Sequence, residues 1–265
     1  MRAPSRPAAD RPGRRGRTPA VLLYGRHAVL AALANPRRRK IRLLATPAAM
    51  ERLAATGVAL PAGLAVTPAD PARLVALVGD DAPHQGLVLE ALPLPPGALA
   101  DLAPDAGGRA RVVVLDRVED PRNVGAIMRS AALLGAKGIV TTARHAPAET
   151  GALAKAAAGA LDVITWVRVP NLARALDELA GMGYWRVGLA PGPGASPLDA
   201  VPRDVPLALV LGAEGSGLRP LTRRKLDWRV AIPMPGAGPL IDSLNVSVAA
   251  GIALWALRAA ADEAA

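Results

Sequence analysis

The sequence contains no cysteine and no phenylalanine, and its only aromatic residues are two tyrosines and four tryptophans among 265 residues. The missing cysteine excludes disulfides, thiolate nucleophiles, iron–sulfur clusters and cysteine-based zinc sites. Three isolated histidines, His27, His84 and His145, show no metal-ligand spacing, so we expect no protein-bound catalytic metal. The scarcity of aromatic rings argues against a protein that stacks single-stranded bases on aromatic platforms.

The sequence also lacks a transmembrane segment and a signal peptide. The longest suspicious run, from Ser243 to Leu257, is uncharged for fifteen residues, which is short of the roughly 20 apolar residues that a membrane span needs. The N-terminus has no apolar region typical of a secretory signal. We therefore expect a cytoplasmic protein with no membrane partner.

Positive charge is abundant, because the formal net charge is +10. A positive balance favours a polyanionic partner such as nucleic acid, although a basic surface that only aids solubility is the alternative. Half of the charge lies in residues 1–20, which hold six arginines, one aspartate and four prolines. This composition predicts a disordered tail. The tail could be an RNA-binding arm or an inert extension, and the sequence leaves both open.

Two α/β segments follow the tail. Residues 21–93 predict a small domain, with helices over 25–34, 48–56 and 71–78 and strands over 41–45, 64–66 and 86–92. Residues 94–109 are rich in proline and glycine, which is typical of a linker. Residues 110–265 predict a second domain. Its expected strands cover 111–115, 138–141, 163–167, 185–189, 207–211 and 230–232, and its expected helices cover 124–134, 151–160, 172–180, 218–226 and 246–261. Strands separated by helices predict a mostly parallel sheet covered on both faces.

Unusual residues concentrate in three loops that follow strands of the second domain, where parallel sheets collect their ligands. In the first, Asn123 stands where a helix N-cap belongs. Gly125 and Arg129 follow at positions i and i+4, and we expect Gly125 to leave a helix face open toward which Arg129 extends its guanidinium. Plain capping and a solvated arginine are the alternatives.

The second loop joins a buried strand to Gly212, Glu214 and further glycines, and matches neither a dinucleotide fingerprint nor a P-loop. The third runs from Ile232 to Ser243 and Asn245. A structural turn and a simple helix start are the alternatives. The helix that follows carries Val248, Ile252, Trp255 and Ala259 at helical spacing, and we expect it to be buried.

Taken together, DPRNVGAIMR (120–129), LVLGAEG (209–215), IPM (232–234) and SLNVS (243–247) closely resemble the three motifs of the SpoU/TrmH class of SPOUT RNA methyltransferases. The resemblance covers residues 110–261. The segment 21–93, with YGRHA (24–28) and HQG (84–86), resembles the L30e-like substrate-binding domain of that class. The start of this segment and VPNLAR (169–174) look most like the branch that methylates a guanosine of 23S ribosomal RNA.

The resemblance implies a C-terminal trefoil knot, in which the chain after Leu207 threads through an earlier loop, and a homodimer. It also implies methyl transfer from S-adenosylmethionine to a ribose 2′-hydroxyl of RNA. By motif position, Gly212, Ile232 and Leu244 would hold the cofactor through backbone groups. The residues implied to form the reactive neighbourhood are Asn123, Arg129, Glu214, Ser243 and Asn245.

The role of Arg129 has two readings. The resemblance makes it a general base, whereas a guanidinium resists deprotonation and would more easily stabilise a developing alkoxide or orient the ribose through a phosphate. For Glu214 we expect a role in orienting Asn123 or the arginine, and for Asn245 a role as a cap that also shapes the cofactor pocket. Two other functions stay open: a transfer-RNA ribose methyltransferase of the same class, and a non-catalytic RNA- or ribosome-binding protein on the same scaffold.

Overall fold

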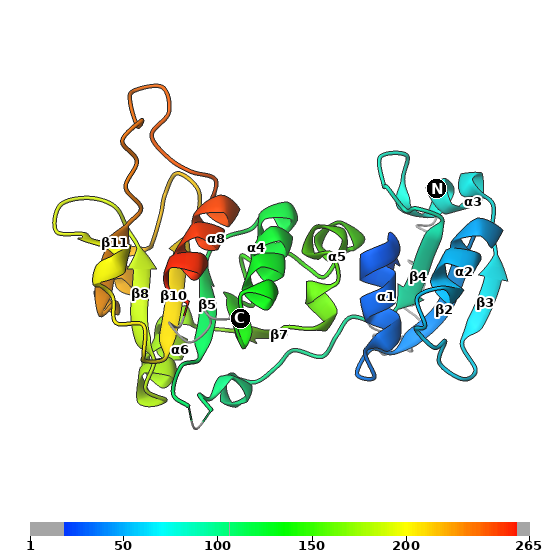
Figure 1. The fold of residues 1–265 in the computed structure, drawn as a ribbon, viewed down its shortest axis with the longest axis horizontal. Helices are drawn as coiled ribbons and strands as arrows, with labels where there is room; N and C mark the ends of the chain where they lie inside the picture. The colour runs from blue at the N-terminus through cyan, green and yellow to red at the C-terminus, as the bar shows by residue number, and fades with distance from the viewer. Residues whose placement is uncertain (1–18, 106, 259–265) are drawn as a thin grey trace, which may run out of the picture.

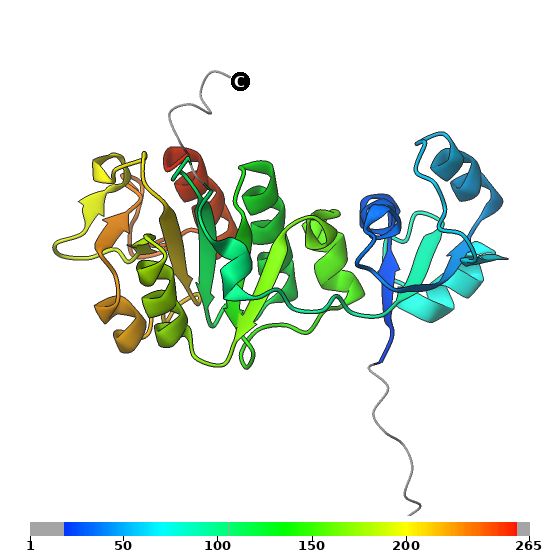
Figure 2. The same ribbon diagram turned by 90° about the horizontal axis from the view of Figure 1, so that it is seen from below.

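The computed structural model describes residues 19–105 and 107–258, so most of the predicted basic tail lies outside the described residues. Two β-sheets organise the chain (Figure 1). We call residues 21–91, with the smaller sheet, the N-terminal unit, and residues 111–258, with the larger sheet, the C-terminal unit. Figure 2 shows the N-terminal unit (blue to cyan) at one end of the larger sheet.

The N-terminal unit has four strands in the order β1-β4-β2-β3, of which only β2 and β3 pair in parallel. Alternate residues of β2 enter different cores: Leu43 joins the core under α1 and α2, and Leu44 joins the core under α3. The two faces of the small sheet are therefore both covered. Its elements are β1 (Val21–Tyr24), α1 (Arg26–Ala34), β2 (Lys40–Ala45), α2 (Pro47–Ala54), β3 (Ala65–Pro68), α3 (Pro71–Val78) and β4 (Leu87–Ala91).

The C-terminal unit has seven strands in the order β7-β6-β5-β10-β8-β11-β9, and every pair is parallel. The predicted parallel sheet is thus confirmed. Its strands are β5 (Arg111–Asp116), β6 (Gly138–Thr142), β7 (Thr165–Val169), β8 (Trp185–Leu189), β9 (Ser196–Pro197), β10 (Leu207–Gly212) and β11 (Trp228–Ala231). Its α-helices are α4 (Pro121–Leu133), α5 (Gly151–Ala157), α6 (Leu172–Gly181), α7 (Pro220–Arg224) and α8 (Val246–Ala256), and it also has the short 3-10 helices η2 (Ala160–Asp162) and η3 (Leu198–Ala200).

The alternation of side chains along β5 shows how both faces of the larger sheet are covered. Val113 and Leu115 enter the core formed with α4, α5 and α8, whereas Val112 and Val114 enter the core formed with α6. All four side chains are 0–1% exposed. This double burial explains the uninterrupted apolar run in the sequence.

Several predicted boundaries differ from the structure. Helix α4 begins at Pro121, three residues earlier than predicted, because Asp120 is its N-cap and proline suits the first helical position. Strand β7 ends two residues later than predicted, and α7 is shorter at both ends. Strands β1 and β9 were not predicted from the sequence.

Part of the predicted linker packs against the larger sheet. The 3-10 helix η1 (Leu99–Leu102) lies within it, and Leu102 is fully buried. The backbone of Gly97 pairs with β7, donating a hydrogen bond to the carbonyl of Trp166 at 2.9 Å. A stretch with a flexible composition is therefore anchored at its centre.

The prediction that α8 is buried all round is wrong. Val248 is 49% exposed, Ile252 41% and Trp255 58%, and Ala259 lies outside the described residues. The buried face of the helix is instead formed by Val246, Ala250, Ala253 and Leu254. Helix α8 thus shows an apolar stripe on its outer surface as well as on its inner one. No helix among the described residues is long and apolar enough to cross a membrane.

Candidate active site

The first loop of the predicted site places its asparagine differently from the expectation. Asp120, not Asn123, caps α4, because its carboxylate accepts the N–H of Arg122 at 2.7 Å. Asn123 is the third residue of the helix, so its side-chain amide is available for contacts with other loops. Its Nδ2 donates to Oε1 of Glu214 at 3.0 Å.

The three predicted loops meet in a cluster of two amides and one carboxylate, Asn123, Glu214 and Asn245. Asn245 Nδ2 donates to Glu214 Oε1 at 2.9 Å and to Asn123 Oδ1 at 2.9 Å. We call this the amide–carboxylate cluster. Glu214 lies 91 positions after Asn123 and 31 positions before Asn245 in the sequence. The three residues meet because their loops follow or precede elements at the carboxyl edge of one parallel sheet.

Asn245 has the capping role that was expected of it. It is the N-cap of α8, and its Oδ1 accepts the N–H of Ser247 at 2.9 Å and its hydroxyl at 2.6 Å. Because the oxygen of this amide is occupied by the helix start, its nitrogen must point toward Glu214 and Asn123. The cap therefore fixes the orientation of the cluster.

The glycines after β10 form a tight turn that presents Glu214. Gly215 and Gly217 have φ of +77° and +64°, a region that favours glycine. A Cβ on Gly212 would lie 2.2 Å from the carbonyl carbon of Gly217, so the loop folds directly back onto the end of the strand. Glu214 lies at the exposed tip of this turn.

Sequence reasoning missed the ion pair that anchors this loop. Asp116, the last residue of β5, is fully buried and accepts hydrogen bonds from Nε of Arg219 at 2.6 Å and from its backbone N–H at 3.1 Å. The signal that could have found it is a carboxylate ending an otherwise apolar strand, since a buried charge needs a partner. Asp116 and Arg219 hold together the loops that carry Asn123 and Glu214.

A cavity of about 660 Å³ opens beside the cluster, a volume typical of a small-molecule site. All three residues predicted to hold the cofactor line it, and so do three of those predicted for the reactive neighbourhood: Gly212, Ile232, Leu244, Glu214, Ser243 and Asn245.

The chemistry of the cavity wall fits S-adenosylmethionine. Leu189, Val230 and Ile232 supply apolar surface at the strand ends for a nucleoside ring. Glu214 and Asp242 place carboxylates in the wall, which favour a cationic sulfonium. Ser243 donates its hydroxyl to Asp242 at 3.0 Å, so this predicted residue orients a carboxylate of the wall.

Arg129 is not part of the amide–carboxylate cluster. It is exposed on α4, and no hydrogen bond or ion pair joins its guanidinium to any other residue that the structure describes. An α-helix turns by about 100° per residue, and Arg129 follows Asn123 by six residues. The two side chains therefore leave the helix axis in directions that differ by roughly 120°. Arg129 therefore extends from a different side of the same helix.

The expected role of Gly125 is also wrong. A Cβ at this position would lie 2.6 Å from the Cβ of Ala156 and 2.7 Å from the carbonyl oxygen of Leu153. Glycine is needed here because α4 and α5 pack backbone to backbone, and the face is not open to a ligand.

Both units of the chain are similar to known proteins. A sequence profile of the SpoU rRNA Methylase family matches residues 110–255, and a profile described as RNA 2′-O ribose methyltransferase substrate binding matches residues 22–96. An uncharacterized tRNA/rRNA methyltransferase of Synechocystis sp. is 36% identical over 239 residues, which are 88% of this chain and 61% of the relative. The chain thus spans less than two thirds of that relative.

Another relative matches over nearly its whole length. The 23S rRNA (guanosine-2′-O-)-methyltransferase RlmB of Pseudomonas syringae is 36% identical over 242 residues, which are 89% of this chain and 94% of the relative. The crystal structure of an AdoMet-bound rRNA methyltransferase from Sinorhizobium meliloti superposes with a TM-score of 0.74 at 26% identity, covering 91% of this chain and 87% of that one.

Proposed function

Because the chain belongs to the SpoU rRNA methylase family, and is therefore an RNA methyltransferase that uses S-adenosylmethionine, we propose that it methylates the ribose 2′-hydroxyl of a guanosine in 23S ribosomal RNA. The observation that carries this proposal is the amide–carboxylate cluster beside a cavity with the chemistry of the cofactor. The name of the Pseudomonas relative supports the guanosine and the ribosomal substrate.

The residues of the chain position and stabilise the reacting hydroxyl. When bound, S-adenosylmethionine supplies a methyl group that its sulfonium already activates. The chain must then align the 2′-oxygen and stabilise the negative charge that develops on it. In our proposal Glu214 holds the amides of Asn123 and Asn245 in one orientation, and Arg129 supplies the positive charge. A guanidinium keeps its proton in proteins, so we assign Arg129 electrostatic stabilisation rather than proton abstraction.

The substrate is tested with purified protein, tritiated S-adenosylmethionine, and unmodified transcripts of 23S ribosomal RNA and of transfer RNAs. We expect label in the 23S transcript, at one guanosine. The phosphodiester bond that follows this guanosine should become resistant to alkaline cleavage, because the 2′-hydroxyl is methylated. Label only in transfer RNA would establish the alternative substrate. Cofactor binding by calorimetry without transfer to either RNA, or no cofactor binding at all, would favour the non-catalytic scaffold.

Removing the Glu214 carboxylate tests the cluster. In Glu214→Ala both amides lose their shared acceptor, and we expect a loss of about 2–4 kcal/mol of transition-state stabilisation, which is about 30- to 800-fold in rate. Glu214→Gln, which keeps an acceptor oxygen, should recover part of the rate. The control is Glu119→Ala, which removes a carboxylate that pairs with His145 in neighbouring loops. Equal rates for Glu214→Ala and the control would remove Glu214 from the mechanism.

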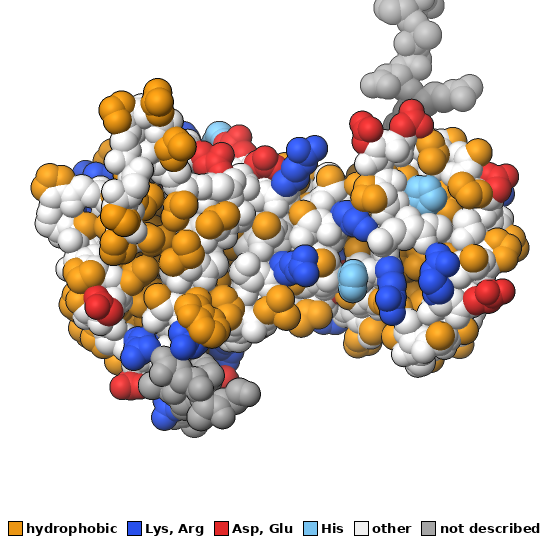
Figure 3. All heavy atoms as spheres, turned by 45° about the horizontal axis from the view of Figure 1, so that its top comes forward, with side chains coloured by type: hydrophobic (Ala, Val, Ile, Leu, Met, Phe, Trp, Pro, Cys, Tyr) orange, Lys and Arg blue, Asp and Glu red, His pale blue; other side chains and the backbone are white. Residues whose placement is uncertain are grey.

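We also propose that the protein is a homodimer joined through the exposed stripe of α8. Val248, Ile252 and Trp255 form this stripe, and Leu133 of the adjacent helix α4 is 77% exposed. Figure 3 shows hydrophobic side chains gathered on this face of the C-terminal unit. An apolar area of this kind is typical of an interface between protein chains. Arg129 precedes Leu133 by about one helical turn and lies on the same exposed face.

A charge in the stripe should separate the protomers. We expect Trp255→Glu to convert a dimer into a monomer in light scattering coupled to size exclusion, because the interface would bury an unpaired carboxylate. Trp185→Glu is the control, since Trp185 is also an exposed tryptophan but lies on β8. A wild-type protein that is monomeric at micromolar concentration would refute the dimer.

The trefoil knot remains a proposal for the same unit. The strand order supports it, because the chain returns after β8 and β9 to insert β10 between β5 and β8. The cofactor cavity lies at the carboxyl end of this inserted strand.

A further inference from the structure

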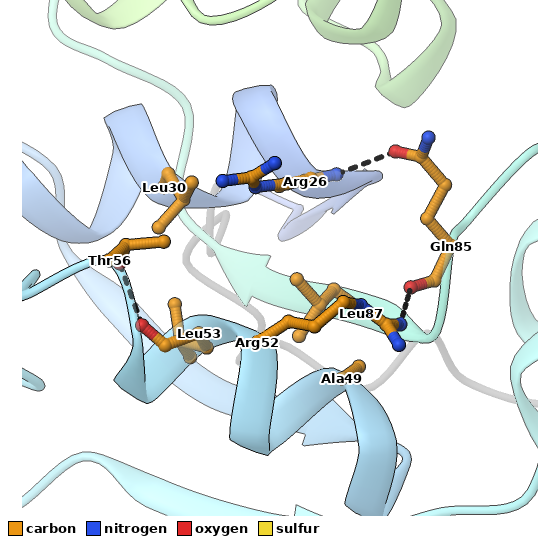
Figure 4. A pocket seen from close by; sticks show the side chains of 8 residues that line it. All are labelled: Arg26, Leu30, Ala49, Arg52, Leu53, Thr56, Gln85 and Leu87. Atoms are coloured by element: carbon orange, nitrogen blue, oxygen red, sulfur yellow. Dashed lines mark hydrogen bonds between the residues drawn. The ribbon is translucent and has the colours of Figure 1, made fainter.

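The N-terminal unit contains a cavity of its own, distant in sequence from the amide–carboxylate cluster (Figure 4). It has a volume of about 230 Å³ and lies between α1, α2 and the turn that leads into β4. Its floor is apolar and comes from Leu30, Ala49, Leu53 and Leu87. The volume is about a third of that of the cofactor cavity, which limits an occupant to one small ring system.

Two guanidinium groups stand at the rim of this cavity. Arg26, at the start of α1, is exposed, and its side chain has no hydrogen-bond or ion-pair partner among the described residues. Arg52 of α2 makes one long hydrogen bond, of 3.4 Å, to the carbonyl oxygen of Gln85. Figure 4 shows both side chains beside the apolar floor. The lining residues include no aspartate or glutamate, so the positive charge of the rim is not neutralised within the cavity.

Gln85 closes the rim in a strained conformation. Its φ is +55°, a left-handed value that is uncommon outside glycine. The turn points both oxygens of Gln85 toward cations: Oε1 accepts from Nζ of Lys155 at 3.2 Å, and the backbone carbonyl oxygen accepts from Arg52 at 3.4 Å. Oε1 also accepts the backbone N–H of Arg26 at 2.9 Å. Strain of this kind is maintained only where the surroundings enforce it, and it is enriched at binding sites. The motifs YGRHA and HQG of the sequence meet at this point.

Basic side chains continue from the cavity toward the amide–carboxylate cluster. Lys155 belongs to α5 of the C-terminal unit, and burial lowers the pKa of its ammonium. Burial raises the pKa of Tyr24, at the end of β1, and the charge of Arg122 opposes this rise. Arg122 is the residue directly before Asn123. Figure 3 shows Lys and Arg side chains on the same face, across the N-terminal unit and near its junction with the C-terminal unit.

We propose that this cavity binds one unpaired nucleotide of the RNA substrate, with its base on the apolar floor and its phosphate against Arg26 and Arg52. The proposal rests on the proposed function, because it assigns a second contact on the same RNA. The nucleotide must be unpaired, since a base that is paired and stacked within an A-form helix has to leave the helix before it can enter a cavity. A guanidinium plane can stack on a base and can also bind a phosphate. The two arginines can therefore serve at a rim where none of the described residues that line the cavity is aromatic.

Alanine variants test the phosphate contacts. We expect Arg26→Ala and Arg52→Ala each to weaken binding of an unmodified 23S ribosomal RNA transcript by about tenfold or more, and to raise KM for that RNA with little change in kcat. In each variant, the slope of the logarithm of the binding constant against the logarithm of the salt concentration should also decrease in magnitude by about one. Arg73→Ala is the control, because Arg73 lies on α3, which covers the opposite face of the smaller sheet. Equal affinity in all three variants would overturn the inference.

Photocrosslinking tests the base. Transcripts that carry 4-thiouridine or 6-thioguanosine should crosslink to the peptides that contain Ala49–Thr56 or Gln85–Leu87. Weakened binding without any crosslink there would leave a phosphate contact and refute a base-binding cavity. The affinity for RNA and the crosslinks both follow binding, so these two readouts also report on a protein that transfers no methyl group. Failure of the proposed function would show instead as a wild type that binds RNA and methylates none.

Discussion

Replacing Arg129 by alanine is expected to lower the rate of methyl transfer by about 100- to 1,000-fold, while S-adenosylmethionine binds with unchanged affinity. The reason is the position of the side chain: it is an exposed cation six residues after Asn123 on α4, and it does not line the cavity assigned to the cofactor. Loss of its charge should therefore affect the developing alkoxide or the RNA, and not the cofactor. Single-turnover transfer to 23S transcript and calorimetry with the cofactor measure the two effects separately.

Two further variants define the role of Arg129. Arg129→Lys keeps the positive charge without the planar fork, so partial recovery would indicate electrostatic stabilisation, and no recovery would indicate bidentate recognition of a phosphate. Arg174→Ala is the matched control, because Arg174 is an exposed arginine on α6, on the other side of the sheet. A near wild-type rate in Arg129→Ala would show that the assignment of this residue is wrong.

The meeting of distant loops could be predicted from the sequence because it depends on one topological rule. Loops that follow parallel strands gather at one edge, so Asn123, Glu214 and Asn245 were expected near each other, and the structure joins them by hydrogen bonds. The direction of each side chain depends on the residue at which its helix begins, which the pattern does not resolve; α4 begins three residues earlier than predicted. Asn123 is inside α4 and not at its cap, and this shift is what directs its amide toward Glu214.

The errors at Gly125 and in α8 have a common physical cause. A glycine on a helix indicates that another group packs closely there, and an all-apolar helix indicates that its surface is covered. Neither pattern identifies the neighbouring element. Gly125 accommodates α5, which the sequence did not identify as its neighbour. In α8 the apolar residues have the correct period, yet Val248, Ile252 and Trp255 face outward, because the sequence does not show which apolar face of the helix packs against the sheet.

Long-range ion pairs between the two units were beyond sequence reasoning altogether. Arg38, in the turn between α1 and β2, binds Asp162 through Nε at 2.8 Å and Nη2 at 2.9 Å, and its Nη1 contacts Glu149 and the carbonyl of Leu92. Its two acidic partners lie 124 and 111 residues away. Nothing in a run of three arginines, Arg37 to Arg39, indicates which one is buried. Only the packed structure distinguishes them.

Arg38 joins the N-terminal unit to the C-terminal unit through buried ion pairs. Its side chain is 0% exposed, and those of Glu149 and Asp162 are each 2% exposed. Burial alone would lower the pKa of Arg38, but hydrogen bonds and charge from Asp162 and Glu149 raise it above its ordinary value. The guanidinium is therefore charged whenever the protein is folded, and it is the cation that both carboxylates bind directly.

We expect Arg38→Met to destabilise the protein by about 3–5 kcal/mol, because it leaves two buried carboxylates without the cation that binds them directly. At about 2–4 °C per kcal/mol for a chain of this size, Tm should fall by about 6–20 °C in calorimetry. Arg37→Met is the control, since Arg37 is the exposed neighbour and should shift Tm by less than about 2 °C. Adding Asp162→Asn to Arg38→Met removes one unpaired charge and should recover part of the loss. A Tm for Arg38→Met equal to that of the control would show that the ion pairs of Arg38 do not stabilise the junction between the two units.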